Sequence, residues 1–496
     1  MELNITRNDW IIEKLGEFAI SQKGKKPKNQ SDIQTEIFQY PYVDIQGFEK
    51  QIFNSYTDGV KCNFCTEDDF LMVWDGSRSG LVGKAVDGAI GSTLVKINLP
   101  KIEDHFAYYF LKSKYLEINT NAKGTGTPHV NPDLLWNYNF PIVPLLEQKA
   151  IVSKIEQLFS ELDNGIENLK TAQEKLKIYR QAVLKKAFEG ELTKEWRDKQ
   201  TDLAPADKLI EDIKKEREER YLKQLEEWKE RVKEWEDNGK DEVKPKKRQP
   251  YKPMIDNTVN ILMDTDLPDG WKYSKLGETY EVYIGSTPSR KMDSYWNGKI
   301  NWVSSGEVAF KNIHHTKETI TQDGLDNTST NVHPIGTILL AMIGEGKTRG
   351  QTAVLDVPAA HNQNTAALRV NQKLLESKLL YYYFYYTYQE TRRIGSGNNQ
   401  KALNKNRISN MSMPLMSKQE QIQILQELES RLSVCDNIET TLTDALKKAE
   451  ALRQSILKKA FEGKLLTEEE LKDIKNNSEY ESAEKLLERI KKERDN

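Results

Sequence analysis

The sequence contains few cysteines and no long apolar run, and each lack excludes a class of protein. Three cysteines among 496 residues cannot form a disulfide framework, so we expect a protein of the reducing cytoplasm. No apolar stretch approaches the roughly 18–20 residues of a membrane span. The first residues, MELNITRNDW, lack the apolar core of a signal peptide. We therefore expect no membrane anchor.

Metal-binding patterns are almost as scarce. Cys62 and Cys65 have the C-x-x-C spacing of a zinc site, but no second pair and no nearby His accompany them. The adjacent His314 and His315 lack the spacing that aims two helical ligands at one ion. We expect no metal, and zinc at the C-x-x-C pair is a minor alternative.

Familiar catalytic signatures are missing as well. The Asn131-Pro132 pair continues into Asp133, so it is not the N-P-P-[YF] string of methyltransferases, and neither a Gly-rich dinucleotide loop nor a G-x-S-x-G elbow occurs. AMIGEGKT at 341–348 satisfies a permissive P-loop pattern, but strand-like residues follow where a P-loop needs a helix. We expect no catalysis and no cofactor, with nucleotide binding at 341–348 a minor alternative.

The chain also lacks an excess of charge of either sign. Lys and Arg number 73 against 76 Asp and Glu, and the net charge is −3. Residues 1–140 carry 15 basic against 18 acidic side chains, whereas residues 268–413 carry 17 against 12. Binding to a nucleic acid must therefore depend on local patches and architecture, or on partner subunits.

What the chain does contain is an internal repeat. Residues 141–192 align with 414–465 without a gap at an offset of 273, and 21 of the 52 positions are identical. Both copies end on the string LKKAFEG, at 184–190 and 457–463. Self-similarity of this extent indicates a duplicated structural unit.

The similarity extends beyond this segment in both directions. The pattern W-x-x-x-K-L-G-E opens at Trp10 and again at Trp271. ADKLIEDIKKERE from Ala206 matches AEKLLERIKKERD from Ala483. The whole chain is one unit written twice.

Each copy contains two kinds of sequence. Short β-like runs broken by Gly, Pro and Asn fill 10–140 and 271–413 and predict a mixed or mostly β domain with a few helices in each copy. Apolar residues from Ile151 to Val183 then recur mostly at three- and four-residue steps, which predicts a coiled-coil helix of about 45 residues, or roughly 65 Å. In the second copy Ser417 and Glu420 form a capping-box pattern at the helix start.

A helix of this length with one apolar stripe needs a partner, and its duplicate is the nearest candidate. We therefore predict an α+β protein with two mixed α/β globular domains separated by two long antiparallel coiled-coil helices in a pseudo-two-fold repeat. The predicted segments are globular domain 1 (1–140), helix 1 (141–193), a charged helical connector (194–267), globular domain 2 (268–413), helix 2 (414–467) and a C-terminal helical tail (468–496). The Glu/Lys-rich run in the connector, at 215–237, is interpreted as a solvated helix face and linker.

In these features the sequence resembles the DNA-specificity subunits of type I restriction–modification systems over essentially its full length. The matching strings in the second copy are GSTPSR at 285–290, YWNGKINWVSSGEV at 295–308, GTILLAMIGEGKTRGQTAVLD at 336–356 and HNQN at 361–364. Each string is weak alone, but their order and the tandem pairing make the resemblance specific. The first domain departs from the pattern, because it offers GKKP at 24–27 in place of a G-x-T-P-S string and is net acidic.

The resemblance implies a non-catalytic, DNA-binding subunit. The two globular parts would be target recognition domains, each reading one half of a split, asymmetric sequence in double-stranded DNA. The paired helices would be the spacer between them, binding two methyltransferase subunits and positioning motor–nuclease subunits. Because the helices stay alike while the domains diverge, the two half-sites should differ.

Candidate DNA contacts lie in Gly-rich and polar loops, where Arg, Lys, Asn and Gln reach bases or phosphates. In domain 1 they are Lys25, Lys26, Ser77, Arg78, Lys84, Lys123, Thr125 and Thr127. In domain 2 they are Ser289, Arg290, Ser304, Ser305, Lys347, Arg349, Ser396, Asn398, Asn399 and Gln400. A purely structural turn is the alternative for each loop.

Other interpretations stay open at this point. The aromatic run YYYFYYTY at 381–388 has the chemistry of a base-stacking platform, but a helix buried against the domain core is the favoured interpretation. The methylase and the nuclease of the system could share one separate polypeptide. A coiled-coil scaffold without a role in DNA binding is a minor alternative.

Overall fold

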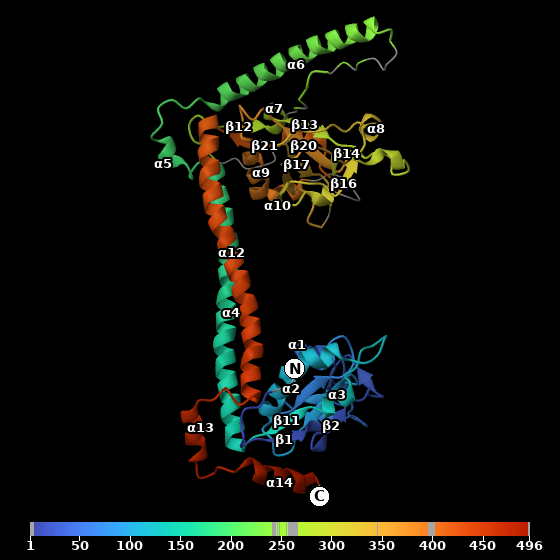
Figure 1. Ribbon diagram of the computed structural model, residues 1–496, viewed down its shortest axis with the longest axis vertical. Helices are drawn as coiled ribbons and strands as arrows, with labels where there is room; N and C mark the ends of the chain where they lie inside the picture. Colours follow the sequence, from blue (N-terminus) through green and yellow to red (C-terminus); the bar gives the residue numbers. More distant parts are fainter. Residues whose placement is uncertain are drawn as a thin grey trace. The chain divides into compact units, whose positions relative to one another are not determined.

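The computed structural model describes residues 4–240, 245, 247, 249–253, 255, 266–344, 346–394 and 402–494. The chain divides into two compact units, which we describe separately. Unit 1 comprises Met1–Ala172 with Thr441–Asn496, and unit 2 comprises Gln173–Thr440. Figure 1 shows the elements of both units along the chain.

Unit 1 is built on short sheets. An antiparallel sheet has the order β2-β10-β7-β8, a mixed sheet has the order β3-β5-β4-β9-β6, and β1 pairs with β11. The strands are β1 (Ile11–Lys14), β2 (Ile20–Lys23), β3 (Gln30–Ser31), β4 (Tyr40–Val43), β5 (Tyr56–Thr57), β6 (Phe64–Cys65), β7 (Phe70–Val73), β8 (Val82–Lys84), β9 (Gly88–Ile90), β10 (Leu94–Asn98) and β11 (Asn139–Ile142). The helices are α1 (Ile45–Lys50), α2 (Asp104–Thr120), α3 (Pro132–Trp136), α13 (Glu468–Lys475) and α14 (Ala483–Arg494).

Unit 2 repeats this plan with additions. The main sheet has the order β13-β20-β17-β18-β15, a second sheet has the order β16-β14-β19, and β12 pairs with β21. The strands are β12 (Lys272–Lys275), β13 (Glu281–Ile284), β14 (Trp296–Val303), β15 (Lys311–Ile313), β16 (Glu318–Ile320), β17 (Ile338–Ala341), β18 (Thr352–Leu355), β19 (Ala359–His361), β20 (Thr365–Arg369) and β21 (Ser412–Leu415). The helices are α5 (Lys194–Arg197), α6 (Ala206–Asp237), α7 (Leu276–Thr279), α8 (Gln322–Asp326), α9 (Ser377–Tyr386), α10 (Tyr388–Arg393) and α11 (Lys405–Asn410).

The strand orders confirm the duplication. β2-β10-β7-β8 in unit 1 corresponds to β13-β20-β17-β18 in unit 2. The parallel pair β4–β9 likewise corresponds to the parallel pair β14–β19. The predicted mixed α/β character of both globular parts is therefore confirmed.

The two long helices are α4 (Leu145–Phe188) and α12 (Lys418–Phe461), and each contributes to both units. In unit 1, Arg453 of α12 pairs with Asp163 of α4. In unit 2, Arg180 of α4 pairs with Asp436 of α12 at 2.7 Å. Further along the chain, Arg197 just beyond α4 pairs with Glu420 at the start of α12. The residue numbers of the partners on α12 therefore fall as those on the α4 side rise. The helices are antiparallel in each unit, as predicted.

A buried Trp–Glu hydrogen bond joins each domain to its long helix. Trp10 Nε1 donates to Glu147 at 3.1 Å in unit 1, and Trp271 Nε1 donates to Glu420 at 2.7 Å in unit 2. Both glutamates are 1 % exposed. A structural junction is thus formed by two motifs that lie far apart in the sequence. One is W-x-x-x-K-L-G-E, which supplies the tryptophan, and the other is the start of the long helix, which supplies the glutamate.

This junction modifies the predicted capping box. The Ser417 hydroxyl accepts the Glu420 N–H at 3.2 Å, as a capping box requires. The Glu420 carboxylate, however, takes hydrogen bonds from Trp271 and from Arg197 at 2.7 Å. A buried carboxylate is stabilised best by a charged partner, which explains this choice.

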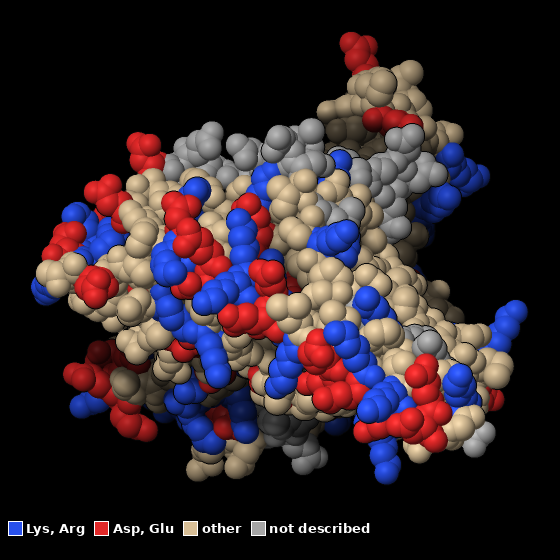
Figure 2. All heavy atoms as spheres, turned by 90° about the horizontal axis from the view of Figure 1, so that it is seen from above, with Lys and Arg blue, Asp and Glu red and all other residues tan. Residues whose placement is uncertain are grey.

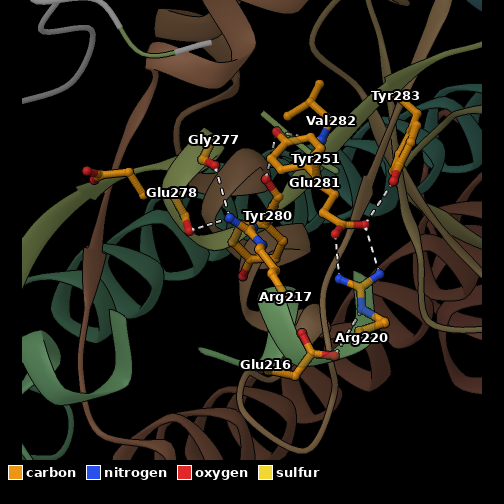
Figure 3. A network of polar contacts seen from close by, with 10 residues as sticks. All are labelled: Glu216, Arg217, Arg220, Tyr251, Gly277, Glu278, Tyr280, Glu281, Val282 and Tyr283. Carbon is orange, nitrogen blue, oxygen red and sulfur yellow. Dashed lines mark hydrogen bonds and ion pairs between the residues drawn. The ribbon is translucent and has the colours of Figure 1, made fainter. Parts of the chain in front are cut away.

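Helix α6 is attached to the domain of unit 2 rather than fully solvated. Leu209 and Ile213 of its first half are buried in the domain core. Figure 3 shows Arg217, on the same helix, donating to the carbonyls of Gly277 and Glu278, the latter at 2.9 Å. The two buried residues precede the Glu/Lys-rich run at 215–237, in which no residue is buried, so the run agrees with the predicted solvated helix face and the buried attachment lies N-terminal to it. The equivalent residues of α14 are buried in unit 1, where Ile490 is 3 % exposed.

A second arginine strengthens the attachment of α6. Arg220 pairs with Glu281, whose side chain is 5 % exposed (Figure 3). Burial acts to raise the pKa of Glu281, but the Arg220 guanidinium outweighs it and the pKa is lowered. The carboxylate is therefore charged, and Tyr283 donates to it at 2.9 Å.

The aromatic run lies on α9 and α10 as a covered helix. Tyr383 and Phe384 are 2 % and 0 % exposed, and both belong to the core of unit 2. This confirms the favoured prediction, a helix buried against the domain core, and not the alternative of a base-stacking platform. No helix within the described ranges is long and apolar enough to cross a membrane.

Candidate DNA-binding surface

In unit 2 the loops singled out from the sequence leave one edge of the main sheet. The register pairs Ile284, the last residue of β13, with Ala366. It pairs Ala341, the last residue of β17, with Thr365, the first residue of β20. Because antiparallel neighbours alternate in direction, the loops after β13 and β17 and the loop before β20 lie side by side.

The second sheet adds its loop to the same edge. β14 and β19 are parallel, and Val303 pairs with His361. The loop 304–307 therefore leaves beside the loop 361–364. Four strings separated by up to 80 residues in the sequence are brought to one surface.

Backbone hydrogen bonds hold these loops together. They run from Ser286 N–H to the His361 carbonyl (3.0 Å), from Asn362 N–H to the Val303 carbonyl (3.0 Å) and from Met342 N–H to the Asn364 carbonyl (2.9 Å). The Thr287 hydroxyl also donates to the Gln363 side chain. The loops thus form one connected layer.

Gly285 makes the close approach of two loops possible. A Cβ at this position would lie 2.1 Å from the His361 carbonyl oxygen and 2.4 Å from that of Asn362. Gly24 has the same role in unit 1, where a Cβ would lie 2.1 Å from the Gly91 carbonyl oxygen. The glycine of G-S-T-P-S and the glycine of G-K-K-P are therefore equivalent in structure.

Two buried imidazoles lie behind the loops of unit 2. The Nε2 atoms of His361 and His333 are 3.2 Å apart, and both rings are nearly inaccessible. Burial lowers the pKa of both rings, and the neighbouring His361 lowers the pKa of His333 further. Both are neutral at neutral pH, so one Nε2–H donates to the other Nε2.

The guanidinium of Arg290 is held on this surface by an aromatic ring and a carboxylate. It stacks on the Trp296 ring at 3.7 Å and pairs with Glu318. The hydrogen bonds that Arg290 donates to Glu318 raise the pKa of Arg290, which stays charged. The Arg290 side chain is nevertheless 55 % exposed. A stacked, exposed guanidinium is preorganised for a guanine edge or a phosphate.

The other predicted residues of domain 2 differ in exposure. Ser289 and Lys347 are exposed, whereas Ser304 and Ser305 are half-buried. Arg349 is 8 % exposed, so its side chain belongs to the interior and not to the loop surface.

Two structural details complete the account of domain 2. Residues 346–355 form a turn followed by β18, so the string at 341–348 is not followed by the helix that a P-loop needs. The predicted contacts Ser396, Asn398, Asn399 and Gln400 lie outside the described residues.

Unit 1 presents an equivalent edge. Lys23, the last residue of β2, pairs with Val95, and Val73, the last residue of β7, pairs with Leu94. The loops at 24–27 and 74–81 therefore leave together.

A third segment of unit 1 lies against this edge. Asp75 forms a β-bridge with His129, which brings the loop 123–129 against the loop after β7.

Most predicted residues of domain 1 lie on this edge and are exposed. They are Lys25, Lys26, Ser77, Arg78, Lys123, Thr125 and Thr127. Lys84 is the exception, because it pairs with Phe70 at the opposite end of β7. The structure does not bring Lys84 together with the others.

Several of these cations are held by carboxylates. Arg78 pairs with Glu49, and Lys123 pairs with Asp133 at 2.8 Å. Exposed pairs of this kind are worth about 0–1 kcal/mol, so a phosphate can displace the carboxylate at little cost. Figure 2 shows Lys and Arg side chains interspersed with Asp and Glu over the face that it presents.

Sequence reasoning missed the residues that position the cations. Trp296 and Glu318 were not singled out, although they fix Arg290. Lys23, paired with Asp75 at 2.8 Å on the edge of unit 1, was also missed. An aromatic residue six positions after an arginine gives no periodic signal, so only the folded strand reveals the stack.

The structure gives no support to a metal site. Burial raises the pKa of the Cys65 thiol to about 12, and its S–H donates to the Val86 carbonyl at 3.2 Å. Among the described residues, no group of three or more His, Cys, Asp or Glu side chains has the geometry to hold an ion.

Comparison with known proteins gives a consistent family. The family described as "Type I restriction modification DNA specificity domain" matches residues 7–171 and 268–448. The EcoDI specificity subunit of Escherichia coli is 25 % identical over 490 residues, which cover 98 % of this chain and 95 % of that protein. The EcoBI specificity subunit of Escherichia coli is 24 % identical over 436 residues, which cover 86 % and 80 %.

A higher identity is found over a shorter stretch. The MjaVIII specificity subunit of Methanocaldococcus jannaschii is 32 % identical over 183 residues, and this match spans 42 % of that protein and 36 % of this chain. It therefore compares about one repeat.

Solved structures share the fold. A chain described under "complex assembly and conformational transition of the type I R-M system" has a TM-score of 0.66 at 18 % identity, with coverage of 94 % of this chain and 100 % of that one. The HsdS subunit from Thermoanaerobacter tengcongensis has a TM-score of 0.51 at 17 % identity, with coverage of 92 % and 97 %. Because the family match covers both repeats, this chain belongs to the family of type I restriction–modification DNA specificity subunits.

Proposed function

We propose that each globular domain reads one half of a bipartite, asymmetric DNA sequence through the loop edge described above. The observation that supports this most directly is the convergence of separated polar strings on one edge of each domain, around Arg290 in unit 2 and around Lys25 and Lys26 in unit 1. Loops carried by a rigid sheet are the usual place for readout residues. Different side chains on the two edges would read different bases.

We propose further that the chain acts without catalysis of its own. It assembles with two methyltransferase subunits and with motor–nuclease subunits, and it works in the cytoplasm, where chromosomal DNA is accessible. The predicted segments at 1–140 and 268–413 are the target recognition domains. The antiparallel pairing of α4 with α12 sets the gap between the half-sites. The relatives named as type I specificity subunits support this assignment.

The decisive experiment uses the natural assembly. The chain is co-expressed with its methyltransferase subunit, and the modified DNA is sequenced. We expect one bipartite motif with unlike halves. Replacing residues 1–140 by the first domain of another family member should change one half only. A change in both halves would contradict the assignment of one domain to one half-site.

The role of the helices is tested separately. Because α4 and α12 are paired, an insertion must lengthen both of them. Fourteen residues, two heptads, added at equivalent places in both helices extend each by roughly 21 Å at 1.5 Å per residue. The gap in the methylated motif should widen or methylation should stop. Methylation of the original motif with unchanged spacing would exclude the helix pair as the ruler.

A further inference from the structure

A pocket of unit 2 combines aromatic rings with carboxylates and takes no part in the proposed DNA readout. Its cavity is about 330 Å³ and lies between the end of α4 and helices α9 and α10. The aromatic side chains that line it are Phe188, Tyr273, Tyr383, Tyr385, Tyr386 and Tyr388. Glu189 and Glu390 line the same cavity, and their charge disfavours a phosphate.

The aromatic walls are held in place by packing. The Phe188 ring stacks on Tyr386 at 6.0 Å with an interplanar angle of 12°. It meets Tyr383 edge-on at 5.0 Å, and the Tyr383 hydroxyl is fixed by donation to the Ser412 carbonyl at 2.8 Å. Ring faces carry partial negative charge, so such walls attract a cation.

The carboxylates are poorly neutralised from within the chain. Glu189 has Lys185 at 3.8 Å, an i,i+4 pair on the helix surface. Glu390 forms no ion pair with any residue that the structure describes. Burial first, and then the charges of Glu189 and Glu390, raise the pKa of Tyr386, which places both carboxylates near that ring. At the rim, Arg392 donates to the Tyr388 hydroxyl at 2.8 Å.

The equivalent region of unit 1 shows which kind of group occupies such a pocket. In unit 1 the equivalent position is filled by Lys114, which is 7 % exposed. Its ammonium lies 5.9 Å from the centre of the Phe110 ring, 5.0 Å from that of Tyr138, and 4.0 Å from the Glu117 carboxylate. At the offset of 273, Phe110 corresponds to Tyr383 and Glu117 to Glu390.

Unit 2 keeps this acid and one of the two rings, as Tyr383, but has Met411 where unit 1 has Tyr138 and lacks the lysine. The residue at the position of Lys114 is Thr387, whose hydroxyl donates to the Tyr383 carbonyl of its own helix at 2.8 Å. Its short side chain leaves the cavity open. A cage for a cation is thus retained where the chain supplies no ammonium of its own.

We propose that this pocket receives a lysine or arginine side chain of a methyltransferase subunit, which takes the place that Lys114 fills in unit 1. The proposal rests on the proposed function for the identity of the partner. It assigns to the pocket a specific anchor, a basic side chain held by rings and by Glu390. Because Lys114 fills the equivalent place in unit 1, the two methyltransferase subunits would be held by different contacts.

The test measures the affinity of the full-length chain for its methyltransferase subunit. Thr387→Lys supplies an internal ammonium, as unit 1 does, and should weaken binding by about tenfold. Glu390→Gln and Tyr386→Leu should weaken it to a similar degree, whereas Tyr386→Phe keeps the ring and should bind nearly as the wild type. Glu195→Gln removes an exposed acid of unit 2 outside the pocket and is the matched control.

Folding and DNA binding are measured on the same proteins. Unchanged thermal unfolding of Thr387→Lys separates a filled pocket from a damaged domain. Wild-type affinity for the methyltransferase subunit in Thr387→Lys and Glu390→Gln would overturn the proposal, and so would equal losses in Tyr386→Phe and Tyr386→Leu. Failure of the wild-type complex to retain duplex DNA would instead contradict the proposed DNA-reading function, because the subunit affinity is measured without DNA.

Discussion

The substitution Gly285→Ala tests whether the loop edge of unit 2 is a connected DNA-reading layer. A Cβ at this position would lie 2.1 Å from the His361 carbonyl oxygen, whereas ordinary contact begins at 3.4 Å. The neighbours are backbone atoms, which cannot move aside as a flexible side chain does. The loop 285–290 or the loop 361–364 must therefore shift by more than 1 Å.

The cost follows from the contacts that the shift breaks. Overpacking of this kind costs about 1–3 kcal/mol. Loss of the hydrogen bond from Ser286 to His361 adds about 0.5–1.5 kcal/mol. A total of roughly 2–4 kcal/mol lowers the melting temperature of a unit of this size by roughly 5–15 °C. Displacement of Arg290 should also weaken DNA binding by about tenfold or more.

The assay compares melting by calorimetry and DNA affinity by fluorescence anisotropy on the methylated motif. Gly306→Ala, in a loop of the same edge, is the control, because a Cβ there meets no atom within 4 Å. Gly24→Ala should produce the same losses through the opposite half-site. If Gly285→Ala melts and binds DNA like the wild type, the inference that these loops form one layer is refuted.

Other predictions concern the buried ionisable residues that stabilise unit 2. Arg197→Leu leaves the buried Glu420 carboxylate without its guanidinium and should destabilise unit 2 by about 3 kcal/mol in calorimetry; Glu420→Gln in the same chain should recover part of this loss. Burial lowers the pKa of His361 from 6.5, so the unfolded chain takes up the proton first and stability should fall as the pH drops below 6.5. In urea titrations His361→Asn should flatten this dependence, and an unchanged slope would contradict it. The pKa of Glu281 is lowered in the folded protein, so its contribution to stability is present above pH 4.5 and is lost as the pH falls through the folded pKa. Arg220→Ala should remove that acid sensitivity. Chemical denaturation between pH 3 and pH 7 measures the difference.

The sequence predicted the repeat, the helices and the covered aromatic run because each is a periodic or repeated signal. The long helices follow from apolar residues at three- and four-residue steps, and their pairing follows from the need to cover two equivalent stripes. The antiparallel direction follows instead from a pseudo-two-fold arrangement of the two repeats. The attachment of α6 was not predicted. Its charged residues dominate the composition, while its buried residues are only Ala206, Leu209, Ile210 and Ile213.

The sequence identified the strings that form the loops of the candidate surface, but not which of their side chains are exposed. The loops converge because strand register places their ends together, which the strings alone do not indicate. Arg349 and Lys347 are two positions apart in one hairpin, yet Arg349 is buried and Lys347 is exposed. Lys84 lies one strand length from the loop that it was grouped with. Which way a side chain points in an irregular turn depends on dihedral angles that composition does not encode.

The division of each unit between distant segments has a consequence for how such proteins change over generations. Unit 1 is completed by Thr441–Asn496, which belongs to the second repeat, so the inherited repeat and the folded unit are not the same piece of chain. A gene cut between its repeats would encode halves that each expose a helix stripe and must find a second copy to cover it. Recombination at the domain boundaries, in contrast, exchanges a target recognition domain and leaves the pairing of α4 with α12 intact. New specificities can therefore arise by exchange of domains, provided that the tryptophan at each junction is kept.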